Sequence, residues 1–206
     1  MWEQIWRVLK PNGACALFGS EPFSSHLRMS QIKYFKYDWV WHKSKPSGIS
    51  TVKFMPMKSH EIISIFAKKK TVFFPIKEPR ELSTQKRLSQ GKFETWNTSK
   101  GSQDSLGKTE KKQVAKLRNP TSVKFFRSKS NNKENYHPTQ KPVDLLEYLI
   151  KTYTLENETV LDFTAGSFST GVAAVNLDRN FIGIEQDKKY FEIGKKRIDE
   201  VLNTNN

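Results

Sequence analysis

The last third of the chain contains a short run of small residues, with one carboxylate directly before it and another at the end of the predicted strand that follows. Asp162 ends a predicted strand, and the run Phe163–Gly171 leads from it into a predicted helix. Glu185 ends the next predicted strand, 19 residues after Gly166 (185 minus 166). A tight turn between a strand and a helix can hold a nucleotide-like ligand, and a carboxylate on the following strand can accept hydrogen bonds from both ribose hydroxyls. Asp162 can hold other polar groups of the same ligand.

The turn departs from the usual glycine-rich spacing at one position. Phe168 stands where the backbone normally needs glycine to let a ligand approach. We therefore expect its ring to narrow the pocket, so that Phe168→Gly would raise cofactor affinity. The same residues also fit a tight strand-to-helix turn in an ordinary α/β domain that binds no nucleotide.

These residues require a frame of alternating strands and helices. Apolar periodicity and turn residues predict helices over Met1–Leu9, Glu21–Phe35, Val143–Tyr153, Ser169–Leu177 and Lys188–Leu202, and strands over Ala14–Phe18, Tyr37–Trp41, Glu61–Ala67, Thr159–Phe163 and Asn180–Ile184. The last third therefore has the order β-α-β-α, which predicts a parallel sheet with both faces covered.

The positive charge of the chain is concentrated in one segment. The 206 residues carry a net charge of +14, and Lys77–Lys133 has 15 lysines and arginines against 5 acidic residues, a net charge of +10. Aromatic residues such as Phe93 and Trp96 are interleaved with these cations. This composition favours contact with nucleic-acid phosphates and bases. A merely solvated insertion is the alternative, because charged runs usually face water.

Composition also limits the cellular compartments in which we expect to find the protein. No apolar run approaches the roughly 20 residues that span a bilayer, which excludes an integral membrane protein. Glu3 and Arg7 interrupt the first apolar pattern, which does not suit a signal peptide. Cys15 is the one cysteine and cannot form an internal disulfide, so we expect a cytoplasmic protein.

A further motif allows a family resemblance to be stated. The sequence His137-Pro-Thr-Gln-Lys-Pro142 precedes the helix that leads to the Asp162 strand. Together with Asp162–Gly171 and Gly183–Glu185, it resembles the amino-group DNA methyltransferases, in the permuted subgroup that places the catalytic half first. Segments similar to successive parts of that catalytic half are Arg7–Gly13, Ala14–Phe23, Tyr37–Lys43 and His60–Phe66.

The resemblance implies an α/β fold, namely a Rossmann-like, circularly permuted methyltransferase sheet with an inserted basic region. It divides the chain into an incomplete catalytic half at 1–76, a target-recognition insertion at 77–133 and a cofactor-binding half at 134–206. The implied activity is methyl transfer from S-adenosylmethionine to an amino group of double-stranded DNA, adenine N6 rather than cytosine N4, without a metal.

The resemblance also implies a role for each motif residue. Glu185 would hold the ribose of S-adenosylmethionine. The turn around the methionine part would consist of Asp162, Thr164, Gly166 and Ser167. The residues beside its amino-acid end would be Thr139, Gln140, Lys141 and Pro142. Lys141 is a point charge suited to a carboxylate, although a solvated lysine at a helix start is the alternative for this residue.

The catalytic residues of the family are missing from this sequence. Its signature is Asp, Asn or Ser followed by Pro-Pro and an aromatic residue, and no Pro-Pro dipeptide occurs here. Glu21-Pro22-Phe23 offers an acid, a proline and an aromatic residue, but its position favours a helix N-terminus. We therefore expect this chain alone to be inactive, with a second polypeptide or a homodimer as its partner.

Two other functions remain open at this point. A non-catalytic DNA-binding protein would keep the basic insertion and have no cofactor affinity. A nicotinamide-dependent oxidoreductase would use the same kind of turn, but nothing after the turn is long enough for a substrate domain. The DNA target sequence cannot be read from the insertion.

Overall fold

A computed structural model describes residues 1–82, 116–128 and 136–204 of this chain. The chain divides into two compact units, one formed by Met1–Phe74 with Ser122–Asn206 and the other by Pro75–Thr121. The larger unit carries every element discussed below except one short ribbon. No helix among the described residues is both long enough and apolar enough to cross a membrane.

The smaller unit contains a two-stranded ribbon. Strand β4 (Glu78–Pro79) pairs antiparallel with β5 (Leu117–Arg118), and the side chain of Arg118 lies 3.5 Å from that of Glu78. Phe93 and Trp96, the aromatic residues that favoured nucleic-acid contact, lie outside the described residues, as does most of the predicted insertion.

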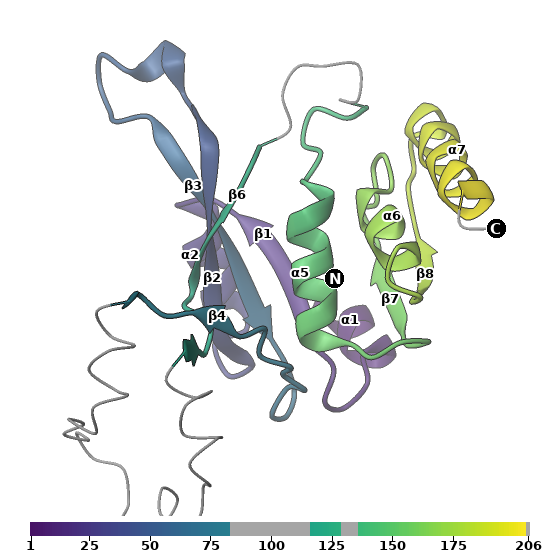
Figure 1. Cartoon of the computed structure of the whole chain (residues 1–206). Coiled ribbons are helices and arrows are strands. Elements are labelled where there is room, and N and C mark those ends of the chain that lie inside the picture. The colour runs from purple at the N-terminus through teal and green to yellow at the C-terminus, as the bar shows by residue number, and fades with distance from the viewer. Residues whose placement is uncertain (83–115, 129–135, 205–206) are drawn as a thin grey trace, which may run out of the picture. The chain divides into compact units, whose positions relative to one another are not determined.

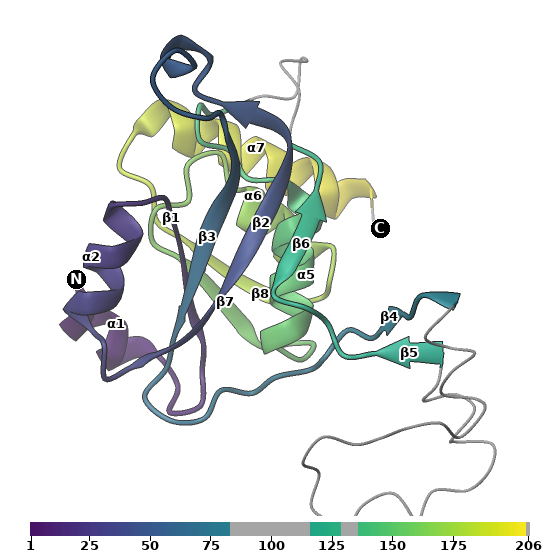
Figure 2. The ribbon, with the colours of Figure 1, turned by 90° about the vertical axis from the view of Figure 1, so that its left-hand side faces the viewer.

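A four-stranded sheet forms one part of the larger unit. Its strands follow the order β1 (Cys15–Gly19), β3 (Lys58–Phe66), β2 (Phe35–Ser47) and β6 (Val123–Phe126) (Figure 2). Strand β3 is antiparallel to both β1 and β2, so β1 and β2 run in the same direction. Strand β6 lies within the segment 77–133 but pairs in parallel with β2.

The second sheet has the parallel order predicted for the last third of the chain. Strand β7 (Thr159–Asp162) pairs in parallel with β8 (Asn180–Gly183), so that Asp162 lies opposite Gly183. Helix α6 (Ser169–Val175) connects the two strands, and α7 (Lys188–Thr204) follows them. The predicted β-α-β-α order is thereby confirmed.

Helix α5 (Val143–Tyr153) joins the two sheets through two different faces (Figure 1). Leu145 and Leu149 pack in one cluster with the core of the four-stranded sheet. Leu146 and Ile150, one position further along, pack in another cluster with α6. All four side chains are buried, and burial of each contributes roughly 1.5–3 kcal/mol.

Helix α1 (Trp2–Val8) covers the opposite face of the four-stranded sheet. Ile5 of α1 is in one cluster with Cys15 and Phe66, whereas the neighbouring Ile65 belongs to the cluster of α5. Because successive side chains of a strand point to opposite faces, α1 and α5 lie on the two sides of this sheet.

One predicted helix is shorter than expected. Helix α2 (Phe23–Ser30) ends before the predicted limit at Phe35, because Gln31 leaves the helical conformation at φ −145°. Phe35 instead begins β2, where its ring packs edge-on against Phe66 with centroids 5.7 Å apart. Strand β2 also continues to Ser47, beyond the predicted end at Trp41, since its pairing with β3 extends that far.

Candidate cofactor site

Asp162 organises the turn that follows β7. Its Oδ1 accepts a hydrogen bond from the Thr164 N–H at 3.0 Å, and its Oδ2 accepts one from the Thr170 hydroxyl at 2.6 Å. A single carboxylate thus links the beginning of the turn to the first residues of α6. Charge-assisted bonds of this kind are stronger than neutral ones, so the turn is held in one conformation.

Glu185, two residues beyond the end of the neighbouring strand β8, closes the same turn. Its Oε2 accepts a hydrogen bond from the Gly166 N–H at 2.8 Å, and its Oε1 accepts one from the Asp187 N–H at 2.9 Å. These backbone donors, that of Asp187 first, lower the pKa of Glu185 below its ordinary value. Gly166 has φ +52°, a conformation that favours glycine.

The motif that precedes α5 contacts this turn. The Ser167 hydroxyl lies 3.3 Å from Oε1 of Gln140, which also accepts a hydrogen bond from the Tyr136 N–H at 2.9 Å. Both the N–H and the hydroxyl of Thr139 lie within hydrogen-bond distance of Nδ1 of His137. The two motifs found in the sequence are therefore adjacent in space.

Lys141 has an acidic partner that the sequence did not indicate. Its Nζ lies 2.9 Å from Oε2 of Glu61, while Nζ of Lys43 lies 3.4 Å from Oε1 of the same carboxylate. The Lys141 ammonium also lies 5.2 Å from the centre of the Phe18 ring. Lys141 is therefore not merely solvated, as the alternative for this residue required, and the two lysines with one glutamate leave a local charge of +1.

Arg197 supports the turn from α7 and was also missed by the sequence analysis. This side chain is only 8% exposed. Its guanidinium donates hydrogen bonds to the carbonyl of Ser167 and to the hydroxyls of Ser167 and Ser169. It also lies 4.9 Å from the centre of the Tyr136 ring. A buried cation with these partners fixes the turn, and the residue is 30 positions away from Ser167.

The expectation that Phe168 narrows the pocket is wrong. Its ring is buried and packs edge-on against Phe181 and Phe191, with centroids 5.8 and 5.7 Å away. Gly194 of α7 makes room for it, because a Cβ at that position would lie 2.5 Å from Cγ of Phe168. The ring therefore anchors the turn in the core, although its own backbone has φ +56°.

A cavity of about 700 Å³ lies beside these groups. Of the predicted cofactor residues, those that line it are Thr139, Gln140, Lys141, Asp162, Thr164, Gly166 and Ser167. Pro142 does not line it and is buried at the start of α5. Glu185 does not line it either, and reaches the turn through the Gly166 N–H.

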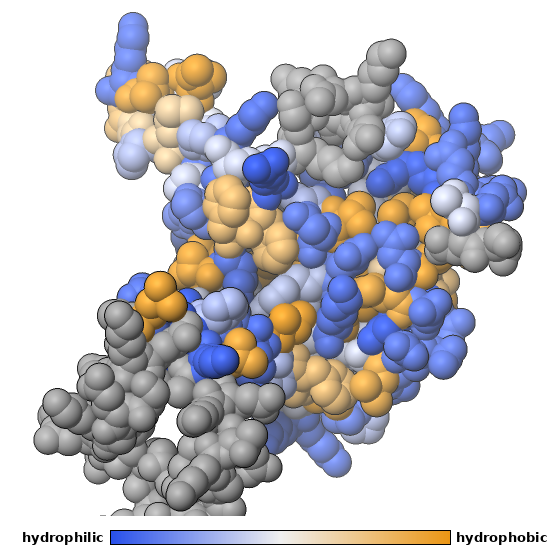
Figure 3. Space-filling model, in the orientation of Figure 1, coloured by the Kyte–Doolittle hydropathy of each residue, from blue (hydrophilic) through white to orange (hydrophobic). Residues whose placement is uncertain are grey.

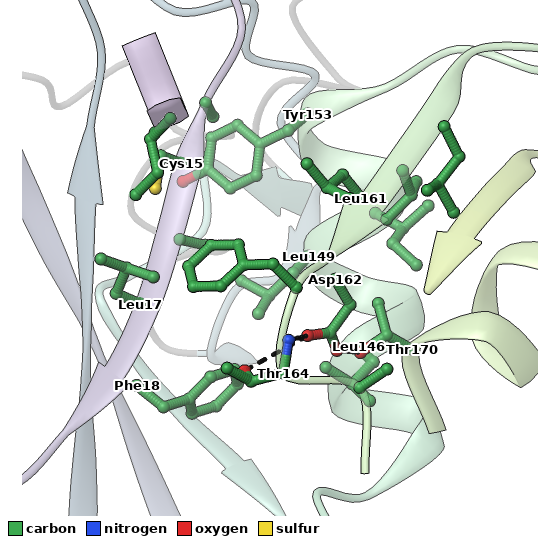
Figure 4. Close-up of a pocket in the computed structure, with 18 of the residues that line it drawn as sticks. Cys15, Leu17, Phe18, Leu146, Leu149, Tyr153, Leu161, Asp162, Thr164 and Thr170 are labelled. Atoms are coloured by element: carbon green, nitrogen blue, oxygen red, sulfur yellow. Dashed lines mark hydrogen bonds between the residues drawn. The ribbon is translucent and has the colours of Figure 1, made fainter. Parts of the chain in front are cut away.

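Much of the remaining cavity wall is apolar, although Lys10, Asn12 and Glu158 also line it. Leu17 and Phe18 of β1 face it from one side and Leu161 of β7 from another, with Leu146 and Leu149 of α5 between them (Figure 4). Residues 139–141 and the turn after Asp162 form one polar end of this largely apolar space, which is the usual arrangement of a binding site for an organic ligand.

Glu21-Pro22-Phe23 lies at the beginning of a helix, as its position in the sequence favoured. Oε2 of Glu21 accepts hydrogen bonds from the Ser25 hydroxyl at 2.6 Å and the Ser25 N–H at 3.2 Å, and its Oε1 lies 2.5 Å from Arg28. The Ser25 hydroxyl, followed by Arg28, lowers the pKa of this carboxyl. Its oxygens contact groups of α2, which agrees with the interpretation of this segment as a helix N-terminus.

Comparison with known proteins gives one consistent family. The model of a family described as DNA methylase matches residues 1–196. Type II methyltransferase M.HinfI of Haemophilus influenzae is 29% identical over 210 residues, which cover 98% of this chain and 50% of that protein. DNA adenine methyltransferase YhdJ of Escherichia coli (strain K12) is 46% identical over 63 residues, 31% of this chain and 21% of that protein.

A solved structure is also similar over most of the chain. The M1.HpyAVI–SAM complex has a TM-score of 0.63 and 27% sequence identity, and covers 95% of this chain and 79% of that one. The curated relatives are longer than the region matched, since the chain spans no more than 50% of either relative named above.

Proposed function

The chain belongs to the DNA methylase family whose model matches it over residues 1–196, and from this premise we propose that it holds the cofactor of an enzyme that methylates an amino group of a DNA base. The name of YhdJ supports adenine N6 over cytosine N4. The main observation in support of this proposal is the cavity where residues 139–141 and the turn after Asp162 converge.

The residues at the polar end of the cavity fit S-adenosylmethionine. Lys141, with the net positive charge of its cluster, suits the carboxylate of the amino-acid end. Asp162 suits the ammonium, because its carboxylate lines the cavity while also holding the turn. Glu185 does not line the cavity and holds the Gly166 backbone from outside it; a ribose placed beyond the turn would meet its remaining lone pairs. When bound, this cofactor supplies an electrophilic methyl group on a sulfonium.

The strand edges beside the groove between the two sheets support the proposal that a partner supplies the catalytic residues. Among the described residues, β1 pairs only with β3 and β7 pairs only with β8. Each strand therefore has one edge without a ladder, and residues of both strands line the same cavity. Such edges present backbone N–H and C=O groups that another strand can pair with.

Strands β1 and β7, which carry the unpaired edges, run in the same direction. In the segments that precede the two strands, Lys10 lies 2.9 Å from Glu158. After them, the ammonium of Lys141 lies over the ring of Phe18, next to the turn. Figure 4 agrees, with Cys15 beside Tyr153 and Phe18 near Thr164. A strand parallel to both would unite the two sheets.

We expect this added strand to be apolar on both faces. Its alternate side chains would meet Ile5 and Leu9 of the α1 segment and Leu146 and Leu149 of α5, all of which line the cavity. Strands buried on both faces have nearly continuous apolar sequences. Its carboxyl end would emerge beside Asp162, where the missing Pro-Pro motif could bind the amino protons of a base.

The proposal assigns this strand to a second polypeptide, in the order expected for a permuted enzyme. The test uses a synthetic peptide with five apolar residues before Asp-Pro-Pro-Tyr, added to the purified chain with labelled S-adenosylmethionine and duplex DNA. We expect methyl incorporation only with the peptide. A matched peptide with proline at the centre of the apolar run is the control, because proline cannot donate to a ladder.

Cofactor binding is tested separately by calorimetry. S-adenosylmethionine should bind the chain without the peptide, whereas NAD should not. A chain that binds duplex DNA but neither cofactor would be the non-catalytic DNA-binding protein. Methyl incorporation by the chain alone would contradict the proposal that a second polypeptide is needed. If the active species without the peptide is a dimer, the result would favour the homodimer.

A further inference from the structure

The connection between β2 and β3 exposes apolar side chains at its tip. We define the arm as Lys45–Lys58, which contains a short 3₁₀ turn at Ile49–Thr51. Phe54 is 87% exposed and Ile49 is 77% exposed. Other exposed apolar residues of the arm are Val52, Met55 and Met57. Figure 3 shows hydrophobic atoms at the outer end of this arm, which Figure 1 shows beyond the sheet.

The charge of this region has one sign. Residues 44–60 contain three lysines, Lys45, Lys53 and Lys58, and no acidic residue. Apolar patches on soluble proteins commonly mark interaction surfaces. Lysines around the patch indicate a partner with negative charge, and apolar side chains at its tip indicate that the partner also offers an apolar surface.

The topology places the arm at the functional edge of the sheet. Strands β1 and β2 run in the same direction, so the arm begins at the edge where β1 ends. At its base, Lys43 and Lys141 share the carboxylate of Glu61. The arm is therefore connected through one ion-pair cluster to the polar end of the cavity.

We propose that the arm inserts Phe54 and Ile49 between base steps of duplex DNA while its lysines contact the phosphates. Apolar wedges that partly unstack a base step are a known means of deforming DNA. An unstacked step at the edge of the sheet from which the arm extends would ease the exit of the target base from the helix. The inference rests on the proposed function only in taking duplex DNA as the substrate, and it adds a DNA contact outside the segment 77–133.

The test measures the affinity of the purified chain for a fluorescent duplex by anisotropy. Phe54→Ala combined with Ile49→Ala should weaken binding roughly tenfold, since stacked aromatic contacts to bases are of that size. The matched control is Met29→Ala combined with Leu202→Ala, two exposed apolar residues of α2 and α7, and it should not change the affinity.

Charge is tested independently of the wedge. Lys53→Gln should reduce the slope of log affinity against log salt concentration by about 1, because one phosphate contact is lost. A duplex with 2-aminopurine at the unstacked step should fluoresce more brightly with the native chain than with the double variant.

Other results would overturn the proposal. Unchanged DNA affinity of the Phe54 and Ile49 double variant would do so. A change in sedimentation coefficient with unchanged DNA affinity would show that the arm contacts a second copy of the chain instead. S-adenosylmethionine should bind the native chain and all variants with the same affinity. If the native chain does not bind S-adenosylmethionine, the proposed function fails, but the proposal for the arm is not affected.

Discussion

The turn after β7 and the groove beside it line the same cavity but differ in how they are stabilised. Within the turn, Asp162, Glu185 and Arg197 satisfy backbone and hydroxyl groups through hydrogen bonds made by this chain. In the groove, β1 and β7 each leave one edge unpaired among the described residues. One region is complete, and the other has the form of a binding site for a strand.

This difference indicates that the turn and the groove have different roles in the proposed enzyme. A cofactor site gains affinity from being formed before the ligand arrives, because less ordering is needed on binding. An open pair of edges instead makes the catalytic part dependent on an added strand. The following variants test whether the turn is as rigid, and the groove as open, as their contacts indicate.

The largest effect is expected from removing the anchor of the turn. Phe168→Gly should lower the free energy of unfolding by about 2–4 kcal/mol, because loss of a buried phenylalanine exceeds the relief of its positive φ. Urea denaturation measures this change. Cofactor affinity should not rise, since the ring does not line the cavity; higher affinity would restore the idea that it obstructs the pocket.

Gly194→Ala should be destabilising by about 1–3 kcal/mol, because its new Cβ would overlap the Phe168 ring. The same substitution in a Phe168→Gly background should add little or even restore stability, since the ring is then absent. A double-mutant cycle by urea denaturation measures this coupling. Additive effects of the two substitutions would show that the ring and the glycine are independent.

Glu185→Ala should weaken S-adenosylmethionine binding by roughly 1–3 kcal/mol, because it removes charge-assisted hydrogen bonds that hold the turn. Calorimetry gives the affinity. Glu192→Ala provides the control, as it removes an exposed carboxylate from α7. Equal affinities of the two variants would mean that the conformation of the turn does not require Glu185.

Acid should remove the contribution of Glu185 to stability. Its pKa is lowered in the folded chain, so this contribution is present above the ordinary glutamate pKa of about 4.3 and is lost as the pH falls through the lower folded value. The difference in unfolding free energy between the native chain and Glu185→Gln should therefore decrease from pH 6 to pH 3. A difference that grows on acidification would reverse the assigned direction.

The smallest effect concerns the groove. Cys15 lines the cavity and is buried, which raises the pKa of its thiol to about 12. Alkylation by iodoacetamide at pH 8 should therefore be slow, and the strand peptide should slow it several-fold further by covering β1. The proline-containing peptide should offer no protection. Equal protection by both peptides would argue against pairing along this edge.

The sequence could predict the elements whose signals are local. The i, i+4 spacing of Leu145 with Leu149 and of Leu146 with Ile150 predicts α5, because residues at that spacing lie on one helical face. The order of strands and helices after residue 159 likewise predicts the parallel pair β7 and β8, since a crossover helix requires it. The position of Asp162 at the end of β7 follows from the same local pattern, and Glu185 lies two residues beyond the end of β8.

The tertiary structure alone decided which distant groups meet. Glu61 lies 80 residues before Lys141 and Arg197 lies 30 residues after Ser167, so neither pairing has a local signal. The direction of the Phe168 ring depended on space left by Gly194 in a later helix. The open edges of β1 and β7 likewise exist only once both sheets have formed, because strand pairing is a contact between segments that the sequence keeps far apart.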